Sequence, residues 1–508
     1  MHTAFAGLSD RGQLLLTGGV AALAALTGWL TWGEQVAGLY RRLGDGGQLA
    51  LTAAAASIFY VTPAFFVYAL ALLILFLLIL MRPAWGLVLV SLVIPFYVPQ
   101  LTKPIASYRF SAVEIFTLLT AAAVLLGRLL ALARRARESG QPVALTWPKL
   151  GRADTAVLIF TGVATLSLLF TSRLDVASNE WRTVILVPAL FYFALRGTRP
   201  HQKETAIILD AWILGGLLVA LIGLAQYLLG SNLITAEGGL LRLRSIYCSP
   251  NNVALYLDRI LPMLVAMLLL GTGRGWRRRF YSLAIIPVAL ALLLTFSKGG
   301  LLLGVPAGLL VVFWIWQRQH GRSPWPWAIA LGVLGLLALL AASQIPQLSA
   351  RLDLFGTTGV FRLQLWQASL QMIREHPLWG VGLDNFLYAY RGRYILDGAW
   401  QEPNLSHPHN IFLDFATRLG LLGVLTGAWM VWILARTLQR VTGSVPRQWL
   451  PVAAGLSGAL AAMLVHGLVD HSFFLVDLAF SFYLMLGTAV WLDNLTNGPK
   501  IIEQSEQS

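Results

Sequence analysis

Charged residues and cysteines are both scarce in this chain. Only 12% of its 508 residues are charged and 57% are hydrophobic, whereas a typical soluble domain is about 25% charged. The mean hydropathy is +0.70. A soluble fold of this size cannot hide so much apolar surface, so the composition predicts a protein that crosses a membrane several times. The single cysteine, Cys248, excludes an internal disulfide and a cysteine-cluster metal site.

Signatures of nucleotide chemistry and of repeat architectures are also missing. The chain has no Walker motif, no glycine-rich dinucleotide fingerprint, no heptad pattern and no repeat of fixed period. The net charge of +14 would suggest a nucleic-acid partner in a soluble protein. In a membrane protein such an excess is typical of basic cytoplasmic loops. We therefore expect membrane lipids, and no nucleic acid, as partners.

Long apolar runs predict an all-α polytopic fold with about 12–14 transmembrane helices, since one span needs about 20 apolar residues. The expected spans lie near residues 14–32, 62–81, 84–99, 112–133, 154–171, 183–195, 206–229, 252–270, 281–296, 299–316, 327–343, 410–435, 450–469 and 473–492. The alanine-rich run 49–61 fits either part of a span or an interfacial helix. The expected divisions are an N-terminal bundle (1–343), a large outer loop (344–409), C-terminal helices (410–492) and a cytoplasmic tail (493–508).

Basic residues recur in alternate loops between these spans. The five basic segments contain Arg134, Arg135, Arg137, Lys149 and Arg152; Arg196, Arg199 and Lys203; Arg274, Arg277, Arg278 and Arg279; Arg318 and Arg322; and Arg436, Arg440 and Arg447. Because short cytoplasmic loops are enriched in Lys and Arg, these segments and both termini are expected to face the cytoplasm. The opposite, outer face then carries the polar segments 230–251, 297–299, 344–409 and 470–472.

The outer loop is expected to contain an amphipathic helix over 358–376. Its apolar positions recur at helical spacing: Phe361, Leu365, Trp366, Leu370 and Ile373. Such a helix, with Arg362 near its start, lies on the membrane surface or caps the bundle. The stretch that follows suits either sugar stacking with phosphate contact or a lid with interfacial anchors. Its aromatic and basic residues are Tyr388, Tyr390, Arg391, Arg393, Tyr394 and Trp400.

Two histidines, His407 and His409, close the outer loop directly before a predicted span. Histidine titrates near neutrality and can take a proton from a hydroxyl group, and a place beside the membrane surface suits a lipid-borne substrate. A purely structural role for both is an alternative. A metal site is another, because His407 and His409 with Asp470 and His471 offer four ligands.

Two pairs of charges fall inside predicted spans. Asp414 and Arg418 are four residues apart, a spacing at which they can pair with each other. Asp258 and Arg259 interrupt the span 252–270. Charges within a span are candidates for function, although here they can also mark the place where the span begins.

A series of motifs runs through residues 240–440. In order, they are Gly359–Arg362, Trp366, His376-Pro377-Leu378, Gly380-Val381-Gly382, Asn385-Phe386, His409-Asn410 and Gly420-Leu421-Leu422-Gly423. Together they resemble the O-antigen ligase/polymerase superfamily, which comprises O-antigen ligases, Wzy-type polymerases and protein O-oligosaccharyltransferases. The ligase signature is His, then Asn, Ser or Gln, nine residues, Gly, two residues, and Gly, Thr or Tyr. His409-Asn410 followed by Gly420 and Gly423 matches it. The turns Ser249-Pro250-Asn251 and Thr295–Gly299 also resemble family segments.

The resemblance implies a GT-C-like glycosyltransferase of the bacterial inner membrane, with its active site on the periplasmic face. The implied donor is a glycan on undecaprenyl pyrophosphate, and the acceptor in ligases is lipid A–core. The implied reaction is inverting and uses neither metal nor cofactor. The expected partners are thus the lipid-linked donor and a lipid or glycan acceptor.

Three residues are the expected catalytic groups within this resemblance: His409, Arg362 and Lys298. The leaving pyrophosphate gains charge in the transition state, and Arg362 can bind it bidentately. Family members usually carry Arg where this chain has Lys298, which keeps the charge but lacks the planar fork; a lysine that merely reaches the interface is the alternative. The expected substrate-binding residues are Arg242, Arg244, Arg182, Asn410, Tyr388, Arg391, Asp470 and His471.

Other function classes compete with the ligase hypothesis. A polymerase or a protein O-oligosaccharyltransferase is the alternative within the superfamily. A secondary transporter or flippase also uses many spans, but it tends to show inverted repeats and interrupted helices, neither of which is evident in the sequence. A structural scaffold for envelope assembly would not depend on the outer His and Arg side chains.

Overall fold

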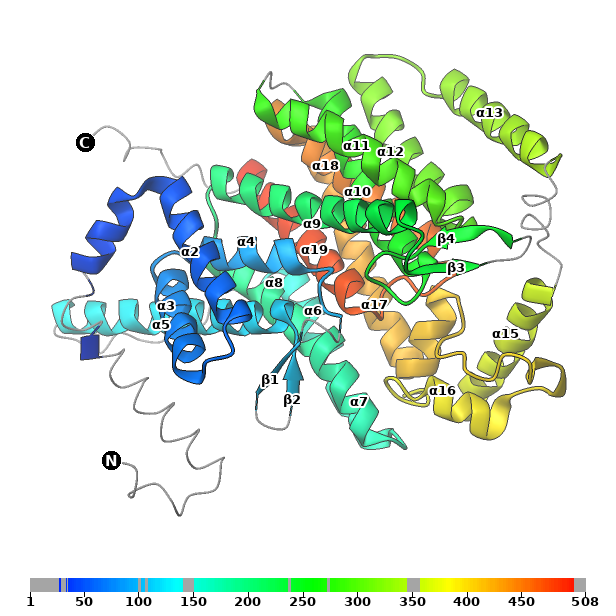
Figure 1. The fold of residues 1–508 in the computed structure, drawn as a ribbon, viewed down its shortest axis with the longest axis horizontal. Coiled ribbons are helices and arrows are strands. Elements are labelled where there is room, and N and C mark those ends of the chain that lie inside the picture. The colour runs from blue at the N-terminus through cyan, green and yellow to red at the C-terminus, as the bar shows by residue number, and fades with distance from the viewer. Residues whose placement is uncertain are drawn as a thin grey trace. The chain divides into compact units, whose positions relative to one another are not determined.

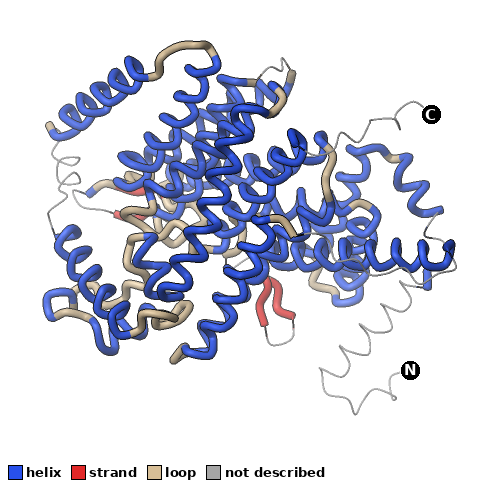
Figure 2. The backbone as a smooth tube through the Cα atoms, turned by 180° about the vertical axis from the view of Figure 1, so that it is seen from behind, coloured by secondary structure: helices blue, strands red, loops and turns tan. Residues whose placement is uncertain are grey.

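The computed structural model describes residues 27–28, 33, 35–98, 102–105, 108–139, 150–235, 239–271, 275–344 and 357–497. These residues are almost entirely helical (Figures 1 and 2), with two small antiparallel strand pairs that the sequence did not predict. Apart from residues 27–28, the expected first span at 14–32 lies outside the described residues. The chain divides into two compact units, residues 1–146 with 197–208, and residues 147–196 with 209–508.

The described part of the first unit is built mainly from four helices and one strand pair, and it contains a charged junction at the bend between two of the helices. Its elements are α2 (Gly44–Val61), α3 (Phe65–Met81), α4 (Pro83–Val93), β1 (Lys103–Ile105), β2 (Tyr108–Phe110) and α5 (Ala112–Ser139). The axes of α3 and α4 differ by 117°. The bend lies at Arg82, whose guanidinium contacts Asp45 at 2.7 Å and Glu204 at 2.9 Å. Pro83 then starts α4, where its missing N–H costs no helical hydrogen bond.

The second unit holds most of the helices. From the N-terminal side it contains α6 (Arg152–Ser167), α7 (Leu174–Glu180), a π-helical segment (Trp181–Leu186), α8 (Val187–Thr198), α9 (Gln202–Leu228), β3 (Leu233–Thr235), β4 (Leu241–Leu243), α10 (Pro250–Leu270) and α11 (Trp276–Leu294). It continues with a π-helical segment (Gly300–Gly304), α12 (Val305–Gln319), α13 (Trp325–Ser343), α15 (Thr357–Glu375), α16 (Phe386–Ala389), a π-helical segment (Tyr390–Tyr394), α17 (Ile411–Ser444), α18 (Leu450–His466) and α19 (Val476–Asn497). The helices α10, α18 and α19 form its centre, since most of their residues are buried.

The structure confirms an all-α, multi-pass architecture, and its described residues contain fewer candidate spans than the 12–14 expected for the whole chain. Among the described residues, eight helices are long and apolar enough to cross a membrane, or nine if the bent pair α3–α4 is one span. The prediction of 12–14 counted apolar runs that the fold does not use as separate spans. The run 84–99 forms only the 11-residue α4. The run 183–195 continues a helix that starts at Leu174 and carries the charged Glu180 and Arg182.

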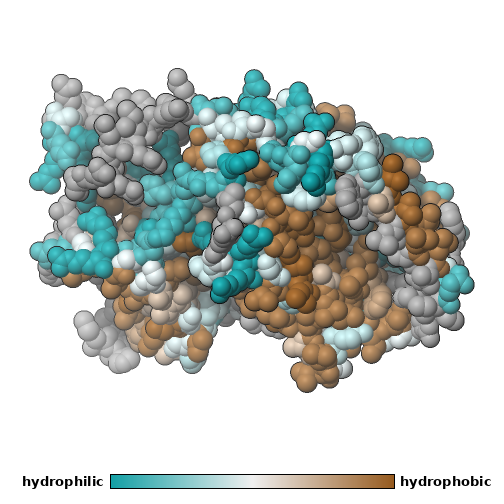
Figure 3. All heavy atoms as spheres, turned by 90° about the horizontal axis from the view of Figure 1, so that it is seen from above, coloured by the Kyte–Doolittle hydropathy of each residue, from teal (hydrophilic) through white to brown (hydrophobic). Residues whose placement is uncertain are grey.

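Apolar side chains cover much of the surface. Figure 3 shows a broad apolar area with few hydrophilic interruptions on the face that it draws. Along α11, for example, large apolar side chains are exposed at Leu283, Ile286, Leu290 and Leu293. Such a surface suits contact with lipid. The C-terminal helix α19 runs to Asn497, past the expected start of the tail at residue 493, and the remaining residues lie outside the described part.

The predicted outer helix 358–376 is present as α15, but its buried side differs from the expected stripe. Leu370, which we expected on the apolar side, is 46% exposed. The residues buried on α15 are Leu365, Ala368 and Met372, and they pack with Phe386, Tyr390 and Tyr394. The outer loop thus has a small core of its own. Tyr390 and Tyr394 belong to that core and are unavailable for sugar stacking.

The helix α17 contains a sharp break at Gly420, the first glycine of the ligase signature. The backbone there has φ +65° and ψ −161°, a region that essentially only glycine adopts. A Cβ atom at this position would lie 2.2 Å from the carbonyl carbon of Leu378. At the break, the N–H of Leu421 donates to Pro377 O at 2.8 Å, and the N–H of Val381 donates to Thr417 O at 2.7 Å. The glycine therefore lets the end of the α15 segment dock against α17.

Candidate active site

The connection between α18 and α19, residues 467–475, holds the start of α17 in place. The N–H of Ile411 donates to Gly467 O at 2.7 Å, and the Asn410 side-chain amide donates to Leu468 O at 3.0 Å. Asn410 Oδ1 also accepts hydrogen bonds from the N–H groups of Phe412 and Leu413, which caps α17. Asn410, which we predicted to bind substrate, thus has a structural role that fixes its neighbour His409.

His409 lies at the start of α17 with Nδ1 directed at a carboxylate. Its backbone φ of +49° is in the left-handed region, which is uncommon for residues other than glycine. Nδ1 lies 2.9 Å from Asp470 Oδ1, and the imidazole remains 20% exposed while Asp470 is only 2% exposed. In the tautomer in which Nδ1–H donates to Asp470, Nε2 carries the free lone pair. The geometry therefore prepares Nε2 to accept a proton.

Asp470 also contacts two further histidines, His407 and His471. Asp470 and His471 are both buried. Nδ1 of His471 lies 3.0 Å from Asp470 Oδ1, and Nε2 of His407 lies 3.6 Å from the same oxygen. Burial alone would raise the pKa of the Asp470 carboxyl, but its histidine neighbours, His409 most strongly, hold that pKa well below its usual value. Burial, together with the neighbouring His471 and His409, lowers the pKa of His407. At neutral pH the cluster thus combines an ionised carboxylate with a neutral His407.

The helix α15, which carries Arg362, is joined to the segment that precedes His409. The indole N–H of Trp366 donates to Pro408 O at 2.9 Å, which joins α15 to the His407–His409 segment. Arg362 lies one helical turn before Trp366 and is only partly exposed. Residues four apart share one face of a helix. Arg362 therefore lies on the side of α15 that meets this segment.

The turn that carries Lys298 packs against the end of α18. A Cβ atom at Gly299 would lie 2.6 Å from the His466 ring and 2.9 Å from Val469 Cγ2. Val469 directly precedes Asp470. The segments of Lys298 and His409 thus both contact the end of α18 or the α18–α19 connection, and the helix that carries Arg362 contacts the His407–His409 segment. A shared pocket for the three side chains remains a prediction.

The predicted binding residues Arg242 and Arg244 lie on and beside β4. Nε of Arg242 donates to Thr295 O at 2.7 Å, and its second nitrogen donates to Asn251 Oδ1 at 2.8 Å. Arg242 thereby joins the two turns that resemble family segments, and this arrangement gives it a positioning role. Nε of Arg244 donates to Asn232 O at 3.3 Å.

The other predicted binding residues lie on α16 and the π-helical segments. Tyr388 is 40% exposed, and the guanidinium of Arg173 stands 4.6 Å from its ring centroid. Arg391 is exposed on the segment 390–394. Arg182 donates to Asn179 Oδ1 at 3.0 Å.

Buried ion pairs of Arg418 hold the segment before His407 in place. Arg418 contacts Asp414 at 2.8 Å, which confirms the expected pair, and it also contacts Glu180 at 2.5 Å, a partner that the sequence did not predict. Its remaining nitrogen reaches Ser406 O at 3.4 Å, directly before His407. The loop before the histidines is therefore tied to α7 and α17.

Asp258 and Arg259 are fully buried inside α10, so they do not mark the start of that helix. Asp258 Oδ2 lies 2.6 Å from His466 Nδ1, and Arg259 donates to Ser472 O at 2.7 Å. Asp258 thus contacts the residue directly before the α18–α19 connection, and Arg259 holds Ser472, two residues after Asp470. In the sequence, these two residues stood out because they are charged and lie within an apolar run.

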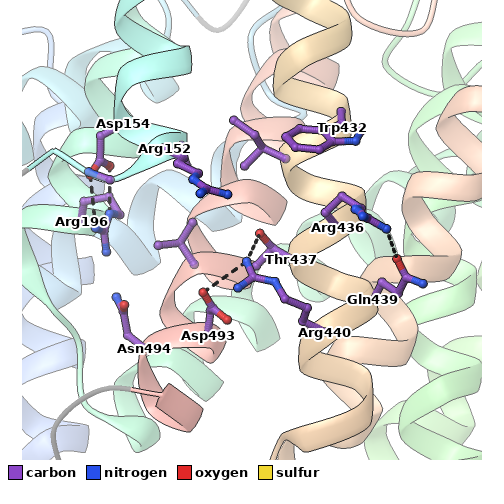
Figure 4. A pocket seen from close by; sticks show the side chains of 14 residues that line it. Arg152, Asp154, Arg196, Trp432, Arg436, Thr437, Gln439, Arg440, Asp493 and Asn494 are labelled. Carbon is purple, nitrogen blue, oxygen red and sulfur yellow. Dashed lines mark hydrogen bonds and ion pairs between the residues drawn. The ribbon is translucent and has the colours of Figure 1, made fainter.

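A basic cavity of about 810 Å³ lies near the other end of α17 (Figure 4). Arg436, on its wall, lies 16 residues, or roughly 24 Å of helix, beyond the break at Gly420, and no residue of the histidine cluster lines the cavity. Figure 4 shows Arg152, Arg196 and Arg440 on its other walls. These arginines come from three of the five basic segments, which therefore lie together, as expected for loops on the same side of the membrane.

Comparison with known proteins agrees with the motifs. Residues 283–427 match the family model described as O-Antigen ligase. No curated protein matches the chain in sequence. The matched segment includes Lys298, Arg362 and His409 and ends before Asp470 and His471. It confirms the resemblance to the O-antigen ligase/polymerase superfamily and supports a membrane enzyme of ligase or polymerase type.

Proposed function

We propose that this protein is a membrane glycosyltransferase that moves a glycan from undecaprenyl pyrophosphate to lipid A–core or a related acceptor. One observation carries the proposal: within a chain that matches the ligase family, the signature histidine His409 is paired with Asp470 at 2.9 Å. The reaction is inverting and metal-independent. It takes place on the periplasmic face of the bacterial inner membrane, on a GT-C-like fold.

His409 and Asp470 together act on the acceptor. Asp470 holds Nδ1–H of His409, so Nε2 takes the proton from the acceptor hydroxyl. The hydroxyl oxygen forms a bond to the anomeric carbon, on the side opposite the pyrophosphate. The bond from that carbon to the pyrophosphate oxygen breaks, and its electron pair leaves with the lipid pyrophosphate. A single displacement of this kind inverts the anomeric configuration.

Arg362 and Lys298 act on the leaving group. The departing pyrophosphate gains negative charge, which a bidentate guanidinium and a lysine ammonium stabilise. By analogy with oxyanion holes, each such donor contributes about 2.7–4 kcal/mol. Both residues lie within the part of the chain that matches the family, and this supports a shared role.

The test is single-turnover transfer from lipid-linked glycan by purified, folded protein. His409→Ala should lower the rate by about 10²–10⁴, the range for loss of a general acid–base group. His376→Ala is the matched control, because His376 is an exposed histidine of the same outer loop. Transfer by His409→Ala at the parent rate would show that the proton role is wrong.

The products separate the alternatives. A ligase gives a single transfer to lipid A–core, whereas an O-antigen or exopolysaccharide polymerase gives a ladder, and a protein O-oligosaccharyltransferase gives a glycoprotein. A polysaccharide transporter forms no new bond at all. The match of His409-Asn410, Gly420 and Gly423 to the ligase signature favours the first outcome.

A further inference from the structure

Four potential metal ligands meet beside α17: His407, His409, Asp470 and His471. One ligand atom from each lies within 4.8 Å of the others. Nδ1 of His409 is 2.9 Å from Asp470 Oδ1 and 3.2 Å from His407 Nε2, and Nδ1 of His471 is 3.0 Å from the same oxygen. Zinc binds nitrogen and oxygen at about 2.0–2.2 Å, so its ligands in a tetrahedral site lie roughly 3.3 Å apart. These three separations are close to that value.

Hydrogen bonds alone do not satisfy this arrangement. Asp470 Oδ1 faces the ring nitrogens of His409 and His471 and also accepts from the backbone N–H of His471 at 2.9 Å. One carboxylate oxygen offers about two lone-pair sites, fewer than these three donors require. Nδ1 of His409 carries at most one hydrogen, yet it faces both Asp470 and His407. A cation among the four atoms would engage one lone pair of each, and Asp470 Oδ1 could still accept from the backbone N–H of His471.

We propose that His407, His409, Asp470 and His471 form a zinc site, and that zinc bound there switches off transfer by occupying His409. Three imidazoles and one carboxylate suit Zn²⁺, which accepts both nitrogen and oxygen ligands. All four residues come from two short segments, 407–409 and 470–471. A backbone hydrogen bond from the N–H of Ile411 to Gly467 O joins the two segments. The ligands are therefore preorganised for a metal.

The switch follows from the two nitrogens of His409 and rests on the proposed role of this residue as a base. Without metal, Nδ1–H donates to Asp470 and Nε2 has the lone pair that accepts a proton. With zinc on Nδ1, the single hydrogen of the neutral ring is on Nε2, which can then no longer accept one. The same histidine therefore serves either zinc or the acceptor hydroxyl.

The first experiment measures binding and does not depend on transfer. Full-length protein, purified and stripped with chelator, is titrated with Zn²⁺ in a calorimeter and with Co²⁺ in a visible spectrometer. We expect one metal per chain and the strong visible absorption of tetrahedral Co²⁺. His407→Gln should weaken binding at least tenfold, and the control His376→Gln should not. Absence of binding to the parent protein, or equal binding by His407→Gln, overturns the site.

The second experiment measures transfer in the presence of metal. Zn²⁺ at saturation should lower the transfer rate of the parent protein at least tenfold, and EDTA should restore it. For His407→Gln, the ratio of the rates with and without zinc should be close to one, whatever the rate of this variant without zinc. Zinc that binds but leaves the rate unchanged, or raises it, overturns the switch. Stoichiometric binding by a protein that never transfers glycan counts against the proposed function and leaves the zinc site supported.

Discussion

Replacing Asp470 by Asn tests the core of the proposed mechanism with almost no change in shape. The carboxylate sits 2.9 Å from His409 Nδ1 and is 2% exposed. Asn keeps the size of the side chain but removes the charge. It can also turn its NH₂ group toward Nδ1, and this would place the ring hydrogen on Nε2 instead. Either change weakens His409 as a proton acceptor.

The expected loss follows from the hydrogen bond that is removed. A hydrogen bond to a charged group contributes about 1.5–3 kcal/mol. Because each 1.36 kcal/mol is about tenfold in rate, Asp470→Asn should slow single-turnover transfer by roughly 10–10². Selection of the wrong tautomer adds to this, and the same change in a serine-protease triad costs about 10⁴.

Asp477→Asn is the matched control for this experiment. Asp477 is also a buried aspartate after the α18–α19 connection, but it accepts a hydrogen bond from Tyr247 at 2.6 Å. Both variants should lose some thermal stability, while only Asp470→Asn should lose rate. Rates are compared with EDTA present, on protein shown to be folded by its melting curve. Transfer by Asp470→Asn at the parent rate, or an equal loss in Asp477→Asn, would refute the reasoning.

Four further outcomes are expected. Arg362→Ala should slow transfer about as much as loss of His409, by roughly 10²–10⁴. Arg362→Lys should recover only part of the lost rate, because lysine lacks the planar fork of the guanidinium. Full activity of Arg362→Ala would contradict the leaving-group role. Transfer should survive EDTA without added Mg²⁺ or Mn²⁺, and a loss rescued by one metal would make that metal catalytic. In a variant that lacks Cys248, the substitution Trp400→Cys should react with a membrane-impermeant thiol reagent added outside the inner membrane, and Arg278→Cys should not. Labelling of Arg278→Cys but not of Trp400→Cys would show that the predicted orientation is reversed. Gly420→Ala should cost about 1–3 kcal/mol of stability from backbone strain, and more because its Cβ would clash with the Leu378 backbone. Gly443→Ala, which has open space around it, should cost nothing, and equal melting temperatures of the two variants would rule out the strain and the clash.

The sequence alone determined the features that depend on neighbouring residues. Apolar runs indicated a multi-pass helical protein because the bilayer imposes the same demand on every span. The outer helix was predicted within one residue of each end of α15, since helical periodicity repeats within a few turns. The ion pair of Asp414 with Arg418 was also predictable, because residues four apart share one helix face.

The tertiary structure decided which of these helices meet. Asp470 lies 61 residues beyond His409, and Glu180 precedes its partner Arg418 by 238 residues. Spacing along the chain does not encode such contacts. Lipid accepts an apolar residue in any position, so a helix that is apolar all round does not reveal its neighbours. Buried polar groups accept very few partners, and the fold that satisfies them brings Asp470 and His471 to the two histidines that end the outer loop.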